Sequence, residues 1–220
     1  TNIMVQKRKT DGTWQSEKSE KTRTTVMEAT IQCFVKIGYT NTTVTKIAEE
    51  AGVSRGAMMH HFTDRFDIIK ASVTYLTDKR LKEFTRLISE AAQEEAGMSV
   101  TEDNLRLTIN ALWKFFHLPS YIAFQELLIA ARTDAELDKV MSPAQKEFNR
   151  RITDSIHALF PVWSGIEATQ DILTDLFFYT LQGMAISKIT NKKQTRIKNL
   201  LELLIQEALR EYQKASAAQS

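Results

Sequence analysis

The 220-residue sequence is poor in residues that cross-link or break a chain, with one cysteine, three prolines and seven glycines. A single cysteine, Cys33, cannot form an internal disulfide or build a cysteine zinc cluster, and we expect it to be a small core residue. No run reaches the ~18 uncharged apolar residues of a membrane span, and no apolar segment near the start indicates a signal peptide. We therefore expect a cytoplasmic protein without a membrane segment.

No stretch alternates apolar and polar residues as a half-buried strand does, and no internal repeat is present. Apolar residues recur instead at spacings of three and four, which predicts an all-α fold. Breakers predict helices near 19–37 and 65–90, and later ones near 101–117, 120–132, 134–160 with a kink at Pro143, 166–190 and 193–215. Residues 1–18 are polar and basic, and we expect a flexible arm that is either solvated or in contact with a DNA minor groove.

Neither sign of charge dominates, because the sequence has 29 Lys and Arg residues and 27 Asp and Glu residues. The total therefore points to no particular partner. The distribution is uneven, since residues 1–70 hold 11 basic and 8 acidic side chains. The segment with this positive excess contains the stretch TVTKIAEEAGVSRGAMMHHF, residues 43–62, which itself holds two basic and two acidic side chains.

That stretch predicts two short helices joined by a turn at Gly52, which is a helix-turn-helix. Thr43 and Ser54 are placed to cap the two helices, and glycine adopts the positive φ of such a turn at little cost. Met58 and Phe62 are expected to face the core. The opposite face of the second helix would then fit a DNA major groove.

The outward face of the second helix carries Arg55, Gly56, Met59 and His60 and has no carboxylate. Arg55 is the best candidate to bind a guanine through two hydrogen bonds. A zinc site at His60 and His61 is disfavoured, because neighbours on a helix point about 100° apart and a third ligand is missing. No acid or nucleophile is spaced to work with these histidines, so we predict no metal, no cofactor, no catalytic residue and no enzyme activity.

Residues 22–70, in which TVTKIAEEAGVSRGAMMHHF is followed by TDRFDIIKA, resemble the DNA-binding domain of the tetracycline-repressor (TetR) family of transcriptional regulators. The layout is also similar, with three N-terminal helices and then an all-helical domain ending in two apolar helices. The resemblance implies a homodimer that binds a double-stranded DNA operator with two half-sites and releases it when a small molecule binds. We accordingly expect a helix-turn-helix domain at 19–66 and a ligand-binding and dimerisation domain at 67–220.

The resemblance also implies, by position, which side chains contact DNA. These are Thr43, Lys46, Ser54, Arg55, Gly56, Met59, His60, His61 and Arg65. Met59 is a departure, because the family usually has an aromatic residue, often tyrosine, at that place.

The last two predicted helices hold more apolar residues than one packed face can bury, which predicts a four-helix interface between two subunits. The residues predicted for this interface are Leu173, Phe177, Leu181, Gly183, Leu201 and Ile205. Other large side chains of the C-terminal part are candidates to line an apolar ligand pocket, with Trp113, His117, Tyr121, Phe124 and Phe178 the first choices.

Several of these residues have alternatives. His117 and Tyr121 flank Pro119 and could equally cap a helix or lie at the surface. Glu126 could bind a cationic ligand, pair with Arg132 or lie on an exposed helix face. The function predicted overall is a repressor released by a largely apolar or aromatic effector. A constitutive DNA-binding regulator with a filled C-terminal core is the alternative, and activation in place of repression stays open.

Overall fold

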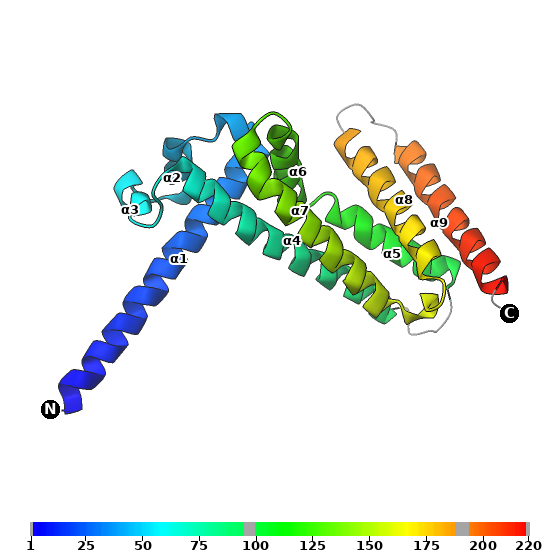
Figure 1. Cartoon of the computed structure of the whole chain (residues 1–220), viewed down its shortest axis with the longest axis horizontal. Helices are drawn as coiled ribbons and strands as arrows, with labels where there is room; N and C mark the ends of the chain where they lie inside the picture. Colours follow the sequence, from blue (N-terminus) through cyan, green and yellow to red (C-terminus); the bar gives the residue numbers. More distant parts are fainter. Residues whose placement is uncertain (1, 95–99, 188–193, 219–220) are drawn as a thin grey trace. The chain divides into compact units, whose positions relative to one another are not determined.

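The computed structural model describes residues 2–94, 100–187 and 194–218, and the regular structure within those ranges is helical (Figure 1). This confirms the all-α fold over the described ranges. The helices are α1 (Asn2–Asn41), α2 (Val44–Ala51), α3 (Arg55–Met59), α4 (Arg65–Glu94), α5 (Glu102–Phe115), α6 (Pro119–Ala131), α7 (Ala135–Leu159), α8 (Glu167–Ile186) and α9 (Gln194–Ala217), with a 3-10 helix η1 at Pro161–Trp163. None of the described helices is both long and apolar enough to cross a membrane.

Glycine and proline residues that were expected to interrupt helices differ in their effect on the backbone. Gly38 follows the predicted end of the first helix at residue 37, and with φ 76° and ψ 167° it takes the backbone of α1 out of the helical conformation there. Pro143 lies inside α7 without ending it. The flexible arm expected over residues 1–18 is helical in the structure, where α1 extends back to Asn2. The sequence explains this extension, because residues 2–18 contain one glycine and no proline to interrupt the backbone hydrogen bonds.

The chain packs as two compact units, each built from two separate stretches of the sequence. The first unit combines Thr1–Asp78 with Ile122–Ala144, and the second combines Lys79–Tyr121 with Gln145–Ser220. Helices α4, α6 and α7 therefore each contribute residues to both units.

Two apolar clusters build the first unit, because α1 buries residues on more than one face. One cluster joins Cys33 of α1 to Ile47 of α2, Met58 of α3 and Ile68 of α4. Cys33 is a core residue, as predicted, and burial raises the pKa of its thiol. The other cluster packs a different part of α1, including Phe34, against α6 and α7, which explains why Ile122–Ala144 belongs to this unit.

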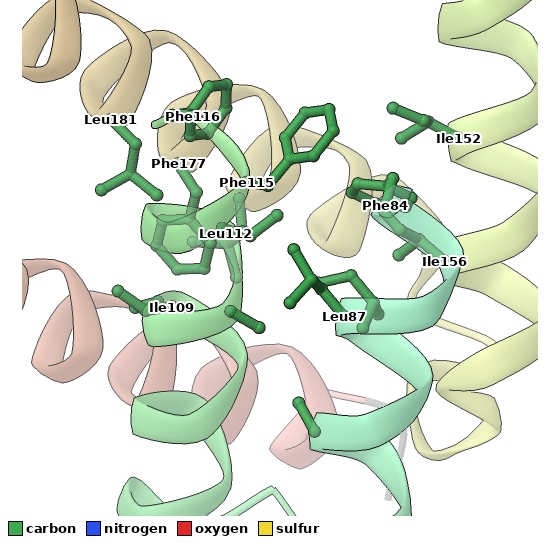
Figure 2. Close-up of a cluster of buried hydrophobic side chains, with 14 of the residues drawn as sticks. Phe84, Leu87, Ile109, Leu112, Phe115, Phe116, Ile152, Ile156, Phe177 and Leu181 are labelled. Carbon is green, nitrogen blue, oxygen red and sulfur yellow. The ribbon is translucent and has the colours of Figure 1, made fainter. Parts of the chain in front are cut away.

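The core of the second unit is rich in aromatic and branched side chains drawn from several helices. Figure 2 shows side chains of α4, α5, α7 and α8 converging, among them Phe84, Phe115 and Phe177. Phe84 and Phe115 pack edge to face with ring centroids 5.5 Å apart. Helix α9 completes this unit by burying Leu204, Ile205 and Ala208 in the same cluster.

Candidate DNA-binding surface and ligand cavity

The helix-turn-helix is held in shape by side-chain caps and one glycine. Thr43 Oγ1 accepts a hydrogen bond from the Lys46 amide at 3.3 Å, and Ser54 Oγ accepts one from the Ala57 amide at 3.1 Å. Both are the caps predicted from the sequence, and each satisfies an amide that its helix leaves open. Gly52 ends α2 with a φ of 65°, which confirms the predicted turn.

Burial of two side chains fixes which face of α3 is available. Met58 is fully buried and Phe62 is nearly so, as expected, and both pack in the cluster with Ile47. Of the predicted DNA contacts, those exposed to solvent are Thr43, Lys46, Ser54, Arg55, Gly56 and His60. Met59, His61 and Arg65 are half-buried. Residues 51–63 carry no carboxylate, so this surface presents neutral and basic groups only.

The histidine pair lies beyond α3 and not on it. Helix α3 ends at Met59, and the amides of His60 and His61 donate to Gly56 O and Met58 O in the turn that follows. The ring of His61 lies 3.4 Å from Ser19 Oγ, and its carbonyl accepts a hydrogen bond from Arg23 at 3.0 Å. His61 is therefore held against α1. No group of three metal-binding side chains occurs among the described residues.

Arg65 makes contacts within the first unit. Its Nε donates to Thr42 O at 2.7 Å, and one terminal nitrogen donates to Tyr39 O at 2.8 Å. The guanidinium also lies over the ring of Tyr39, 4.8 Å from its centroid. These contacts fasten the start of α4 to the end of α1, so they account for an arginine at this position without DNA.

Glu126 takes a partner that the sequence did not indicate. Its Oε1 accepts a hydrogen bond from the Tyr39 amide at 2.9 Å, whereas a cationic ligand, Arg132 or an exposed face was expected. Tyr39 also donates its hydroxyl to Asp134 Oδ2 at 2.8 Å. Tyr39 is thus tied to both α6 and the start of α7, and neither tie is visible in the local pattern of the sequence.

The second unit contains a cavity of about 660 Å³. Its wall is formed by side chains of α4, α5, α7, the turn around η1, α8 and α9, together with Val100 before α5. None of the lining residues is charged. They are Phe84, Ile88, Ala92, Val100, Asn104, Leu105, Thr108, Leu112, Ile156, Leu159, Phe160, Pro161, Val162, Trp163, Gln170, Leu173, Thr174, Phe177, Phe178 and Tyr212. The volume lies in the range of small-molecule sites.

Only one of the five predicted ligand residues, Phe178, lines this cavity. Tyr121 packs in the aromatic core against Phe115 and Phe116, and Phe124 is fully buried in the first unit. His117 lies with Nδ1 2.8 Å from Trp113 O and its ring against the Trp113 ring, which agrees with the capping alternative. Trp113, His117, Tyr121 and Phe124 do not line this cavity. A helical pattern separates apolar from polar faces, but it does not show where the core is hollow.

Most of the predicted dimer residues lie inside the second unit. Leu173, Phe177, Leu181 and Ile205 are buried in the chain's own core, and Leu173 and Phe177 line the cavity. Leu201 is half-buried against the same core, and Gly183 is exposed. The exposed large apolar residues of α8 and α9 are instead Ile172, Leu176, Tyr179, Ile186, Leu200 and Leu203.

Those exposed residues follow a pattern that sequence inspection could have found. On α8, Ile172, Leu176, Tyr179, Gly183 and Ile186 are spaced by four, three, four and three residues, the spacing of a helix–helix seam. We call these five residues, with Leu200 and Leu203 of α9, the exposed stripe. The core-facing residues of α8, among them Leu173, Phe177 and Leu181, have a similar spacing. The sequence alone therefore does not tell which apolar face of α8 is buried in the chain's own core.

Comparison with known proteins adds to this geometry. Residues 26–71 match the family described as bacterial regulatory proteins of the tetR family. The chain is 26% identical over 176 residues to an uncharacterised HTH-type transcriptional regulator of Mycobacterium tuberculosis, covering 78% of this chain and 85% of the relative. It is 30% identical over 87 residues to the HTH-type transcriptional repressor AcnR of Corynebacterium glutamicum, covering 40% and 44% of the two chains. A solved TetR-family transcriptional regulator of Streptomyces coelicolor shares the fold, with a TM-score of 0.64 at 14% identity over 90% of this chain and 83% of that chain.

Proposed function

The chain belongs to the TetR family of transcriptional regulators, and we propose from this premise that it is a homodimeric repressor that binds a palindromic operator and responds to a small molecule. It is a DNA-binding regulator and not an enzyme. The observation that carries the proposal is the helix-turn-helix within residues 26–71, with both predicted caps made and the outer face of α3 open to solvent.

We propose that the exposed residues of this unit contact DNA. Arg55 is exposed at the first position of α3, where its guanidinium can reach a base edge. Thr43, Lys46, Ser54, Gly56, Met59 and His60 would contact the backbone or neighbouring bases. His61 and Arg65 stay in the proposal as secondary contacts, because each already bonds within the chain.

Dimerisation is proposed through the exposed stripe. Ile172, Tyr179 and Leu203 are each more than 60% exposed, which is unusual for large apolar side chains that follow one seam. A second copy related by a two-fold axis would cover them with the same residues. Gly183 is exposed within this seam, and the lack of a side chain there would let a second helix approach closely.

A dimer also fits the energetics of DNA recognition. One helix-turn-helix unit makes few base contacts, and two copies a helical turn apart on DNA bring affinity into the range of specific regulators. The symmetry of the operator would then mirror the symmetry of the protein.

Ligand response is proposed because the second unit is hollow. A constitutive regulator is the alternative, and it would be expected to fill its C-terminal core, whereas about 660 Å³ is open. Helix α4 supplies Ile68 and Ile69 to the cores of the first unit, and Phe84 and Ile88 to the wall of the cavity. An effector that binds better to a conformation with low DNA affinity would release the operator by that difference in binding free energy.

Repression is favoured over activation because the relative AcnR is named a repressor. In vitro transcription tests this direction. A template carrying a DNA sequence that the protein binds should give fewer transcripts as protein is added, and the same template with a scrambled site should be unaffected. More transcripts with added protein would identify an activator, and equal transcripts from both templates would refute transcriptional regulation through that site.

A further inference from the structure

Several residues that line the cavity of the second unit have uncharged polar side chains. Among its lining residues, Gln170 and Thr174 lie one turn apart on α8, so that both face the same side. Asn104 and Thr108 have the same spacing on α5. Amide and hydroxyl groups both donate and accept hydrogen bonds, and none of them carries a charge.

Gln170 is the most telling of these residues. It is only 5% exposed, and it lines the cavity. Thr174 is half-buried and lines the same side of the cavity. Asn104 and Thr108 already have interactions within the chain. A few uncharged polar side chains in an otherwise apolar wall can exchange hydrogen bonds with a polar group of a ligand, so Gln170 and Thr174 are the best-placed partners for a group that enters the cavity.

The other residues of the wall indicate which charge a bound group can carry. The lining contains no Asp, Glu, Lys, Arg or His. The buried guanidinium of Arg80 precedes Phe84 by one turn of α4, but it does not line the cavity and stacks 3.7 Å from the centroid of the Phe148 ring. A ligand carboxylate or ammonium would therefore lose its hydration without meeting an opposite charge, which is far more costly than burying a neutral polar group.

We propose that the effector is an uncharged, largely apolar molecule with one amide, hydroxyl or carbonyl group, and that Gln170 and Thr174 bind this group. The apolar body of the effector packs against the aromatic wall that includes Phe84, Trp163 and Phe178. This inference rests on the proposed ligand response, but it makes its own claim about the chemistry that the cavity accepts.

A series of probes with one apolar body and different head groups tests the proposal. The full-length protein is titrated calorimetrically near neutral pH with 6-phenylhexanamide, 6-phenylhexan-1-ol, 6-phenylhexanoate and 6-phenylhexylammonium. We expect the two neutral probes to bind at least about tenfold more tightly than the two ions, because only the ions must be desolvated without a counter-charge. Equal or tighter binding of either ion, or no binding of any probe at millimolar concentration, would overturn the proposal.

Substitutions then locate the neutral head group. Gln170→Leu should weaken binding of the amide probe about tenfold, and Thr174→Val should weaken it less, because each removes a hydrogen-bonding group while keeping an apolar side chain of similar size. Gln213→Leu, the same change at an exposed position of α9, should leave binding unchanged. Unchanged binding to Gln170→Leu in a protein that retains its helical circular dichroism would remove Gln170 from the site.

DNA binding is measured separately with the same amide probe. If the probe binds but does not release DNA, the proposed ligand response fails while the inference about the cavity stands. If an ion binds best and releases DNA, the ligand response stands and the inference fails. The two claims are thereby distinguished.

Discussion

At the scale of single residues, the contact between Gly38 and Glu126 shows how one position serves both a turn and a tertiary contact. Gly38 has φ 76° and ψ 167°, a region of the backbone map that is essentially reserved for glycine. A Cβ built there would lie 2.7 Å from Glu126 Oε1, the oxygen that accepts from the Tyr39 amide. Glycine is therefore needed both for the backbone path and for the approach of the carboxylate.

Gly38→Ala is expected to destabilise the first unit by about 2–3 kcal/mol, because backbone strain adds to displacement of Glu126. Gly56→Ala is the matched control, since a Cβ at Gly56 meets no atom within 4 Å, and alanine in a helix is favoured by up to about 1 kcal/mol. Urea unfolding followed by circular dichroism measures both. Equal stability of the two variants would contradict the account of the Gly38 contact.

The pKa of Asp134 is lowered by the hydrogen bond from the Leu137 amide first and by the Tyr39 hydroxyl second. A carboxyl whose pKa is lowered on folding stabilises the folded state above its ordinary pKa, near 3.8, and this stabilisation is lost as the pH falls through the lowered value. Asp134→Asn cannot titrate, so the stability difference between wild type and variant should be largest near neutral pH and shrink on acidification. Thermal unfolding at a series of pH values tests this, and a difference that is constant with pH would refute it.

Arg55 is the residue on which DNA specificity is proposed to depend most. Arg55→Ala should weaken binding to the preferred DNA by about 1–3 kcal/mol and relax the preference at one base position. Arg132→Ala removes an exposed arginine from the loop after α6 and should have little effect. Fluorescence anisotropy with labelled duplexes makes the comparison, and equal losses for both variants would indicate general electrostatic attraction without base recognition.

At the scale of elements, local sequence determines the helix-turn-helix more completely than it does α8. The caps at Thr43 and Ser54 and the turn at Gly52 depend on neighbours within four residues, so residue type and spacing were enough to predict them. Helix α8 is apolar on two faces, one against the core and one in solvent, and the sequence pattern alone did not tell which face is which. For the same reason, four residues that were predicted at the dimer interface, Leu173, Phe177, Leu181 and Ile205, lie in the core of the chain.

Ile172 offers a direct test of the exposed stripe. Ile172→Glu should raise the dimer dissociation constant about 100-fold or more, because each subunit would bury an unpaired carboxylate at the interface. Ile129→Glu is the same change at a position of α6 that is 55% exposed and lies outside the stripe, and it should leave the dimer intact. Sedimentation velocity measures the oligomeric state, and a wild-type monomer or an unaffected Ile172→Glu dimer would contradict the proposed interface.

At the scale of the whole molecule, the fold class and the order of helices followed from spacing and breakers, but the grouping of helices did not. The segment Ile122–Ala144 joins the N-terminal helices because Phe124, Leu127 and Leu137 bury against α1 and α4. Such long-range pairing leaves no local signal, since any amphipathic helix could supply the same face. An apolar pocket was predicted in the C-terminal part, but of the five first choices only Phe178 lines the cavity, because the position of an empty volume depends on how all its walls pack.

The central claim is that two copies of this chain read a symmetric DNA sequence. The most direct measurement is selection of bound duplexes from random DNA at a fixed salt concentration, because the electrostatic part of binding depends steeply on salt. We predict enrichment of a palindrome with half-sites about one helical turn, ~10 base pairs, apart. Absence of any enriched sequence, or enrichment of an isolated half-site alone, would contradict the account.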